Sequence, residues 1–177
     1  MRKVLTQKFF DRPTLKVAEE LLGKYLVRKY RGKEIALMIT ETEAYDGFKD
    51  KASQAHRGET PRNKIMFGEA GRSYVYFTYG MHWMLNITTG KKGYPAAVLI
   101  RGADVVSGPA RLTKFLKIDK KLNNQILSKV TGLWMEDRGV KVSKKDILRS
   151  PRIGIPRAEE WVDKPYRFLF KQKNKRP

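Results

Sequence analysis

The chain has 177 residues, of which 41% are hydrophobic and 32% are charged, a composition typical of one folded domain and not of a disordered chain. It has no cysteine and only two histidines, so disulfides and cysteine-ligated zinc are excluded and no metal or other cofactor is expected. No apolar run approaches the roughly 20 residues of a membrane span, and the N-terminus lacks the apolar core of a signal peptide. We therefore expect a cytoplasmic protein without a membrane contact.

The charge balance favours a polyanionic partner. The sequence holds 38 Lys and Arg residues against 18 Asp and Glu residues, a formal net charge of +20. A Lys-rich proteome is the alternative explanation, but such proteomes usually raise Glu together with Lys. Because the acids lag far behind here, nucleic acid is the first candidate partner and an anionic membrane surface the second.

The first predicted elements are a helix and a hairpin. Asp11 can cap a helix over 11–23, whose apolar stripe faces the core, and Gly23 supplies its left-handed stop. The apolar pattern then predicts an antiparallel pair of strands over 24–30 and 34–41. This opening part of the chain is interpreted as scaffold.

The remaining elements are mostly strands. Apolar patterns predict them over 73–79, 82–89, 95–100, 133–135, 140–142 and 168–170, with a second helix from 110 to about 118. The run 95–100 is apolar throughout, which is typical of a central strand covered on both faces. We expect a single α/β (α+β) domain over 1–177, a curved, mostly antiparallel sheet with a few flanking helices. The basic end, about 171–177, is expected to fray.

Three polar side chains follow one another at spacings of two where the predicted strand 34–41 ends. If the backbone stays extended, Glu41, Glu43 and Tyr45 project from one face. A carboxylate and a phenol at the open end of a buried strand suit a pocket that holds a flat ring and activates a water. The spacing does not choose between the two carboxylates, and both could instead pair with basic residues.

The segment 46–72 is long and polar, and a connection of this length inside a compact domain is usually functional or disordered. Met66 and Phe67 are expected to pin its far end to the core, which favours an ordered loop. Its basic and amide side chains suit contacts with phosphates. The residues expected at a nucleic-acid backbone are Arg57, Arg62, Asn63 and Lys64.

Two residues in the next strands are hard to explain by packing. Tyr79 lies at the tip of a tight hairpin, where an aromatic ring would protrude and could wedge between stacked bases. Asn86 lies mid-strand among apolar residues, where its amide either bonds to the backbone or contacts a ligand. His82 is interpreted as structural, since it lacks a companion histidine for a metal.

The order and spacing of many separate segments resemble the alkyladenine (3-methyladenine) DNA glycosylases over nearly the whole chain. The segments are Glu41-Thr-Glu43-Ala-Tyr45, Thr60-Pro-Arg-Asn63, Met66-Phe67, Tyr74-Val-Tyr76, Tyr79-Gly-Met81, Asn86, Leu99-Ile-Arg101, Gly108-Pro109, Trp134-Met-Glu-Asp137, Arg152-Ile-Gly154 and Glu160-Trp161…Arg167-Phe168. The resemblance implies this family's fold and a monomeric, monofunctional glycosylase of base excision repair. Such an enzyme hydrolyses the N-glycosidic bond of alkylated or deaminated purines flipped out of duplex DNA, in the cytoplasm or at a nucleoid.

The resemblance also implies roles for residues of the site. Glu43 matches the general base that activates a water for attack on C1′, and Arg101 matches the arginine that helps to place that water. A backbone carbonyl near Ile153 would be a third contact of the water. Tyr45 and Tyr76 match the aromatic walls of the base pocket.

Further roles concern selection of the damaged base. Tyr79 matches the wedge that fills the vacated stack, and Asn86 the amide that crowds the exocyclic amine of guanine. One departure is that Gln54 stands where bacterial members have a pocket histidine, with His56 two residues later. Gln54 could still donate to the base or the sugar-phosphate, and His56 could swing in beside it.

Two other functions fit the same residues. One is a catalytically silent nucleic-acid-binding module of the same fold. The other is a different hydrolase in which His56 and Glu41 carry out acid–base chemistry. The sequence does not rank 3-methyladenine, 7-methylguanine, hypoxanthine and ethenoadenine as substrates.

Overall fold

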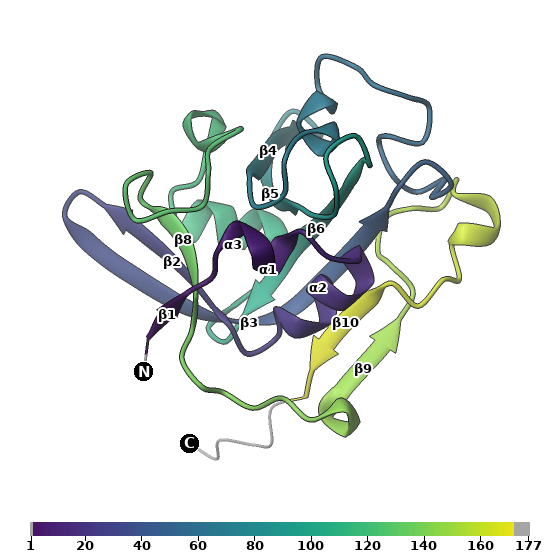
Figure 1. The fold of residues 1–177 in the computed structure, drawn as a ribbon. Coiled ribbons are helices and arrows are strands. Elements are labelled where there is room, and N and C mark those ends of the chain that lie inside the picture. Colours follow the sequence, from purple (N-terminus) through teal and green to yellow (C-terminus); the bar gives the residue numbers. More distant parts are fainter. Residues whose placement is uncertain (1, 172–177) are drawn as a thin grey trace.

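The longest strand, β3, runs through the middle of the sheet in the computed structural model, which describes residues 2–171 (Figure 1). The ten strands form one sheet in which every pairing is antiparallel, with the main order β1-β8-β2-β3-β6-β5-β4. The strands are β1 (Lys3–Val4), β2 (Tyr25–Tyr30), β3 (Lys33–Asp46), β4 (Ser73–Thr78), β5 (His82–Thr88), β6 (Ala96–Ala103), β7 (Val106–Ser107), β8 (Leu133–Asp137), β9 (Ile147–Ser150) and β10 (Arg167–Phe170). The expected α+β class with a mostly antiparallel sheet is confirmed.

Strand β3 changes partners along its length, and this places the site. Its first half pairs with β2, and from Ile39 onward it pairs with β6. The register against β6 shifts on both sides of Glu41, which marks a bulge at that point. Strand β10 covers the other edge from Glu41 to Glu43. The carboxylates predicted from the spacing therefore lie where three strands meet.

The helices are short and cover one part of the sheet (Figure 1). They are α1 (Gln7–Phe10), α2 (Thr14–Glu20) and α3 (Pro109–Phe115), with 3-10 turns η1 (Lys64–Phe67), η2 (Lys120–Leu122), η3 (Lys144–Asp146) and η4 (Glu159–Trp161). The predicted helix over 11–23 is shorter than expected, because Pro13 is its N-cap and the chain leaves the helix before Gly23, where φ is +78°. A side chain at Gly23 would also meet Val142 Cγ2 at 2.6 Å. None of the helices described is long and apolar enough to cross a membrane.

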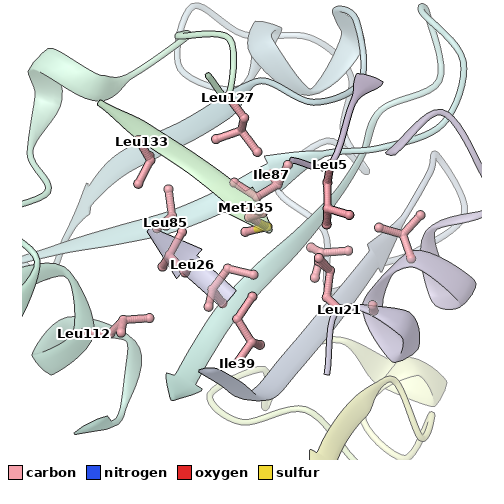
Figure 2. Close-up of a cluster of buried hydrophobic side chains, with 14 of the residues drawn as sticks. Leu5, Leu21, Leu26, Ile39, Leu85, Ile87, Leu112, Leu127, Leu133 and Met135 are labelled. Carbon is pink, nitrogen blue, oxygen red and sulfur yellow. The ribbon is translucent and has the colours of Figure 1, made fainter. Parts of the chain in front are cut away.

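The core fills the space between the sheet and the helices. Figure 2 shows leucine, isoleucine and methionine side chains from β2, β3, β5, β8 and α3 that converge on one cluster, together with Leu21 at the end of α2. A second, smaller cluster lies under the loop that follows β3. Its buried members are Ala55, Ile65, Met66, Tyr74 and Ala97. Met66 is buried there and Phe67 packs against the cluster, as expected for a pinned loop.

The short edge elements were not predicted. Strands β1, β7 and β9 are two to four residues long, too short for a pattern of alternation to be recognised. The segment predicted as a strand at 140–142 has no strand structure, and Val142 instead packs against the main core. The expected frayed end lies, except for residue 171, outside the described residues.

Candidate active site

Glu43 is the most buried carboxylate of the site, with 0% of its surface exposed. Its Oε1 accepts a hydrogen bond of 2.8 Å from the backbone N–H of Ile153, and its Oε2 accepts one of 2.9 Å from the hydroxyl of Tyr45. The guanidinium of Arg101 on β6 lies 3.4 Å from Oε1. A buried carboxylate held by three donors from three segments has a fixed orientation.

Glu41 lies next to this group but has a different environment. Its Oε1 accepts from Arg101 Nε at 3.1 Å and from Arg167 Nε at 2.6 Å. Arg101 therefore bridges both carboxylates, whereas Glu41 is held between two cations. Spacing alone did not distinguish the two, and the structure places the phenol of Tyr45 on Glu43.

The protonation of the site follows from burial and from these partners. Burial raises the pKa of Glu43, and Arg101 is the strongest of the influences that oppose this shift, followed by the Ile153 N–H and the Tyr45 hydroxyl. Burial, and then the charge of Glu43, also raise the pKa of Tyr45 well above its ordinary value. Tyr45 therefore remains a neutral hydrogen-bond donor, and burial gives Glu43 a higher proton affinity than an exposed carboxylate has.

Two aromatic side chains, Tyr45 and Tyr76, have pKa values raised first by burial, and both lie close enough to Glu43 for its charge to raise them further. Tyr45 and Tyr76 both pack, half-buried, against the smaller core cluster. Tyr74, fully inside that cluster, has its ring 5.2 Å from the ring of Tyr76 and donates a 2.7 Å hydrogen bond to Gln54 Oε1. The guanidinium of Arg62 lies 5.0 Å from the centre of the Tyr76 ring. These contacts hold the two rings that were expected to form the pocket walls.

The loop between β3 and β4 is fastened from within by Asn63. Its side chain is 1% exposed; it accepts from the N–H of Thr60 and donates to the carbonyls of Gln54 and Gly58. We expected Asn63 at a phosphate, but both donor hydrogens of its amide are used inside the loop. The side chain therefore shapes the loop and is not presented at its surface.

Gln54 and His56, where the sequence departs from the pattern of the family that it resembles, both lie in the loop between β3 and β4. Gln54 is exposed; its Oε1 accepts a hydrogen bond from the Tyr74 hydroxyl, and its side chain also forms a hydrogen bond with Tyr76 that partly opposes the effect of burial on the pKa of that phenol. His56 directs Nδ1 at the carbonyl of Phe48, 3.0 Å away, so Nδ1 carries a proton. His56 thus contributes to the loop, while Gln54 presents a donor beside the aromatic rings.

Asn86 and Tyr79 lie on the hairpin formed by β4 and β5. Asn86 is 3% exposed and donates to the carbonyl of Tyr74 at 3.3 Å, so the backbone partner considered from the sequence is present. Tyr79 is 78% exposed, and both Tyr79 and Gly80 have positive φ, 52° and 64°. A bulky residue in that region is strained, and such strain is typical of functional sites. The hairpin thus presents Tyr79 to the surroundings.

The remaining basic residues of the loop lie at the surface. Arg57, Arg62 and Lys64 are exposed, and Arg62 also donates to the carbonyl of Phe77, which ties the loop to β4. No cluster of three or more His, Cys, Asp or Glu side chains that could hold a metal occurs within 2–171. A groove of the molecule lies elsewhere, next to α2, and contains none of the residues of this site.

A buried ion pair that the sequence did not predict connects the segments that carry the residues of the site. Arg152 forms a bidentate pair with Asp50, and both side chains are fully buried. Arg152 also donates to the carbonyl of Ala44, and its guanidinium lies 4.8 Å from the ring centre of Tyr45. It therefore connects β3, the following loop and the segment that carries Ile153. Arg152 and Asp50 are 102 positions apart in the sequence, so no local sequence signal predicts this pair.

Comparison with known proteins identifies a family for the chain. The sequence model of the methylpurine-DNA glycosylase family matches residues 8–107 and 102–174. A relative from Methanocella arvoryzae is 43% identical and aligns with 95% of this chain and 92% of its own length. Relatives from Carboxydothermus hydrogenoformans (43% identical, 95% of each chain) and Legionella pneumophila strain Lens (42%, 97% of this chain and 96% of its own) are similar over comparable lengths. The name of each assigns it, provisionally, to the 3-methyladenine DNA glycosylases.

The antiparallel fold with this family match defines a DNA repair glycosylase. The chain belongs to the methylpurine-DNA glycosylase family and is a DNA glycosylase.

Proposed function

We propose that Glu43 activates a water molecule that hydrolyses the N-glycosidic bond of a damaged purine flipped out of duplex DNA. The observation that carries this proposal is the complete burial of Glu43 among Arg101, Tyr45 and the Ile153 N–H. These donors orient the carboxylate, while burial gives it a raised pKa. A positioned general base of this kind contributes about 10²–10⁴-fold to a rate.

The reaction balances without a covalent enzyme intermediate. The water oxygen bonds to C1′, the C1′–N bond breaks, and its electron pair leaves with the purine. The proton of the water passes to Glu43. A purine methylated at N3 or N7 is cationic before this step and leaves as a neutral base, whereas a neutral purine such as hypoxanthine leaves with the electron pair as an anion and takes up a proton from water. The enzyme is accordingly proposed to be monofunctional, with no amine nucleophile and no strand cleavage.

Selection of the base is assigned to the residues around Glu43. Stacking between Tyr45 and Tyr76 offsets the few kcal/mol that extrusion of a base costs, since stacking contributes about 1–3 kcal/mol per base. Electron-rich rings also favour a cationic purine. Asn86 is proposed to crowd the exocyclic amine of guanine, and the carbonyl of Ile153 to contact the attacking water.

We assign contacts with the DNA to residues around the base pocket. Tyr79 is proposed to fill the stack from which the base was removed. Arg57, Arg62 and Lys64 are proposed to contact phosphates, with Asn63 keeping the loop in shape for them. We propose that the protein acts as a monomer on duplex DNA in the cytoplasm or at a nucleoid.

The NH₂ of Gln54 is proposed to be the donor that replaces the family histidine. Its oxygen accepts from the Tyr74 hydroxyl, so the NH₂ is the end of the amide that would contact a bound base or sugar-phosphate. Unlike an imidazole, an amide does not titrate between pH 5 and 8. This donor is therefore expected to be independent of pH.

The test is single-turnover base release from matched duplexes that carry a methylated purine, hypoxanthine or ethenoadenine. We expect Glu43→Gln to abolish release, because a neutral amide cannot accept the proton, while affinity for a duplex with an abasic-site mimic is retained. Glu41→Gln and His56→Ala serve as controls and should retain release. If Glu43→Gln lost binding and activity together, Glu43 would be structural. If His56→Ala lost release and Glu43→Gln kept it, the alternative hydrolase would be correct.

A further inference from the structure

A groove next to α2 is separate from Glu43 and its neighbours. It has a volume of about 1020 Å³ and lies between α1, α2, β1, the chain segment after β8 and the pair β9–β10. Its floor is apolar and is formed by residues that are only partly covered by the core. They are Phe9, Leu15, Val142, Ile147 and Tyr166. Partly exposed apolar side chains that line one concave surface are typical of a binding site.

Alternation along β10 shows that this groove and the pocket lie on opposite faces of the sheet. Arg167 bonds to Glu41 on the side of the pocket. Its neighbour Phe168 lines the groove. Because successive side chains of a strand point to opposite faces, a molecule in the groove would not occupy the pocket.

The charge of the groove is strongly basic. Its lining contains seven Lys or Arg residues and three acidic residues. Each of the three acids is already neutralised, Glu20 by Arg12, Asp137 by Lys24 and Glu19 by Arg149. By contrast, the lysines at 8, 16 and 144 form no ion pair with any carboxylate in the described part of the chain.

This combination selects the chemistry of the occupant. A nucleic-acid backbone would pair its phosphates with the lysines but would leave the apolar floor exposed to water. An apolar chain alone would cover the floor but would bury the lysines without counter-charges, which costs free energy. A peptide with both acidic and apolar side chains satisfies both parts, with aliphatic groups on the floor and carboxylates at the rim.

We propose that the groove beside α2 is a docking site for a segment of a partner protein that is rich in acidic and apolar residues. Complementary charge attracts the segment and sets its register, and the apolar floor supplies most of the contact. Binding on the face opposite to Glu43 leaves the enzyme free to act on DNA while the partner is attached.

The test uses the whole protein and a short fluorescent peptide of leucine and glutamate as the probe, measured by anisotropy. Two matched peptides separate the contributions: one replaces leucine by serine and the other replaces glutamate by lysine. We expect the leucine–glutamate peptide to bind at least about tenfold more tightly than either. Equal binding of the serine–glutamate peptide would show only attraction to a protein of charge +20, and would overturn the proposal.

Variants then locate the site. Lys16→Glu combined with Lys144→Glu should weaken probe binding about tenfold or more. A control with the same change of charge, Lys120→Glu combined with Lys121→Glu on η2, should change it much less. Base release should be unaltered in both variants, which separates this proposal from the mechanism at Glu43. Equal effects of the two variants, displacement of the probe by undamaged duplex DNA in proportion to its charge, or absence of binding would each reject the groove as a peptide site.

Discussion

Glu43 shows how the surroundings of a side chain change its chemical properties. Its sequence context resembles that of Glu41, two residues earlier on the same strand, and Arg101 contacts both. The difference is that Glu41 is held by a second cation, Arg167, while Glu43 is fully buried and bonded to Tyr45 and the Ile153 N–H. Burial raises the pKa of Glu43. That shift favours proton acceptance by Glu43.

The pH dependence of base release should report on this carboxylate. Glu43 must be ionised to act as a base, and its pKa is raised, so activity should fall with decreasing pH at a point above about 4.3, the ordinary value for Glu. Arg101 is the largest influence that lowers this pKa. Arg101→Met should therefore move the acidic limb to still higher pH, in addition to slowing the reaction.

The measurement is the single-turnover rate against pH for wild type and Arg101→Met. Arg167→Met is the matched control, because Arg167 contacts Glu41 and its removal should leave the limb nearly in place. An identical limb in wild type and Arg101→Met would show that Glu43 is not the titrating base.

Tyr79 combines a highly exposed aromatic side chain with a backbone of positive φ. We expect Tyr79→Ala to weaken affinity for a duplex with an abasic-site mimic by about 5- to 150-fold, equivalent to roughly 1–3 kcal/mol of lost stacking. Affinity for undamaged duplex, measured in the same assay, should change little. Tyr79→Asn separates side chain from backbone, because Asn tolerates the positive φ of 52° found here. Equal losses on damaged and undamaged DNA would argue against a wedge.

At the scale of elements, the site depends on how β3, its following loop and the segment before η4 are joined. Arg152 and Asp50 make that junction inside the protein. Removal of one partner leaves an uncompensated buried charge, whereas removal of both does not. The pair therefore offers a way to distinguish stability from positioning.

Arg152→Gln should destabilise the protein by about 3–5 kcal/mol, because Asp50 remains charged and buried. The double variant Arg152→Gln/Asp50→Asn should recover much of this stability in chemical denaturation. Base release should stay impaired in the double variant, since the Ile153 N–H and the Tyr45 ring lose the guanidinium that places them. Recovery of both stability and base release would assign the pair a purely structural role.

At the scale of the whole molecule, the excess of basic residues sets the affinity for DNA in general. The association constant for undamaged duplex should fall linearly with salt on a double-logarithmic plot, with a slope of about 0.9 for each phosphate contact. Arg57→Gln and Lys64→Gln should each reduce that slope by about 1. Lys120→Gln is the matched control on η2 and should reduce it less. If all three substitutions reduced the slope equally, the loop residues would make no more phosphate contacts than Lys120 does.

Much of the architecture was readable from local patterns. Alternation and apolar runs predicted β2, β4, β5, β6, β8 and β10, and the positions of α2 and α3, because these elements bury side chains with a regular period. The strands β1, β7 and β9 form because they pair with neighbouring strands. Segments of two to four residues are too short to show an alternating pattern that would predict such pairing. Helix α2 ended earlier than its apolar residues suggested, since Leu21 and Leu22 remain buried after the last helical turn.

The sequence by itself determined the basic character of the protein, the resemblance to its family and the common face of Glu41, Glu43 and Tyr45. Alternation of side chains along a strand involves only neighbouring residues, so the common face could be predicted directly from the sequence. Only the tertiary structure decided which carboxylate is bonded to Tyr45, that Asn63 is turned into its loop, and that Arg152 pairs with Asp50. These outcomes depend on burial and on contacts between distant segments. The free energy of a buried polar group is set by the partners that the fold brings to it.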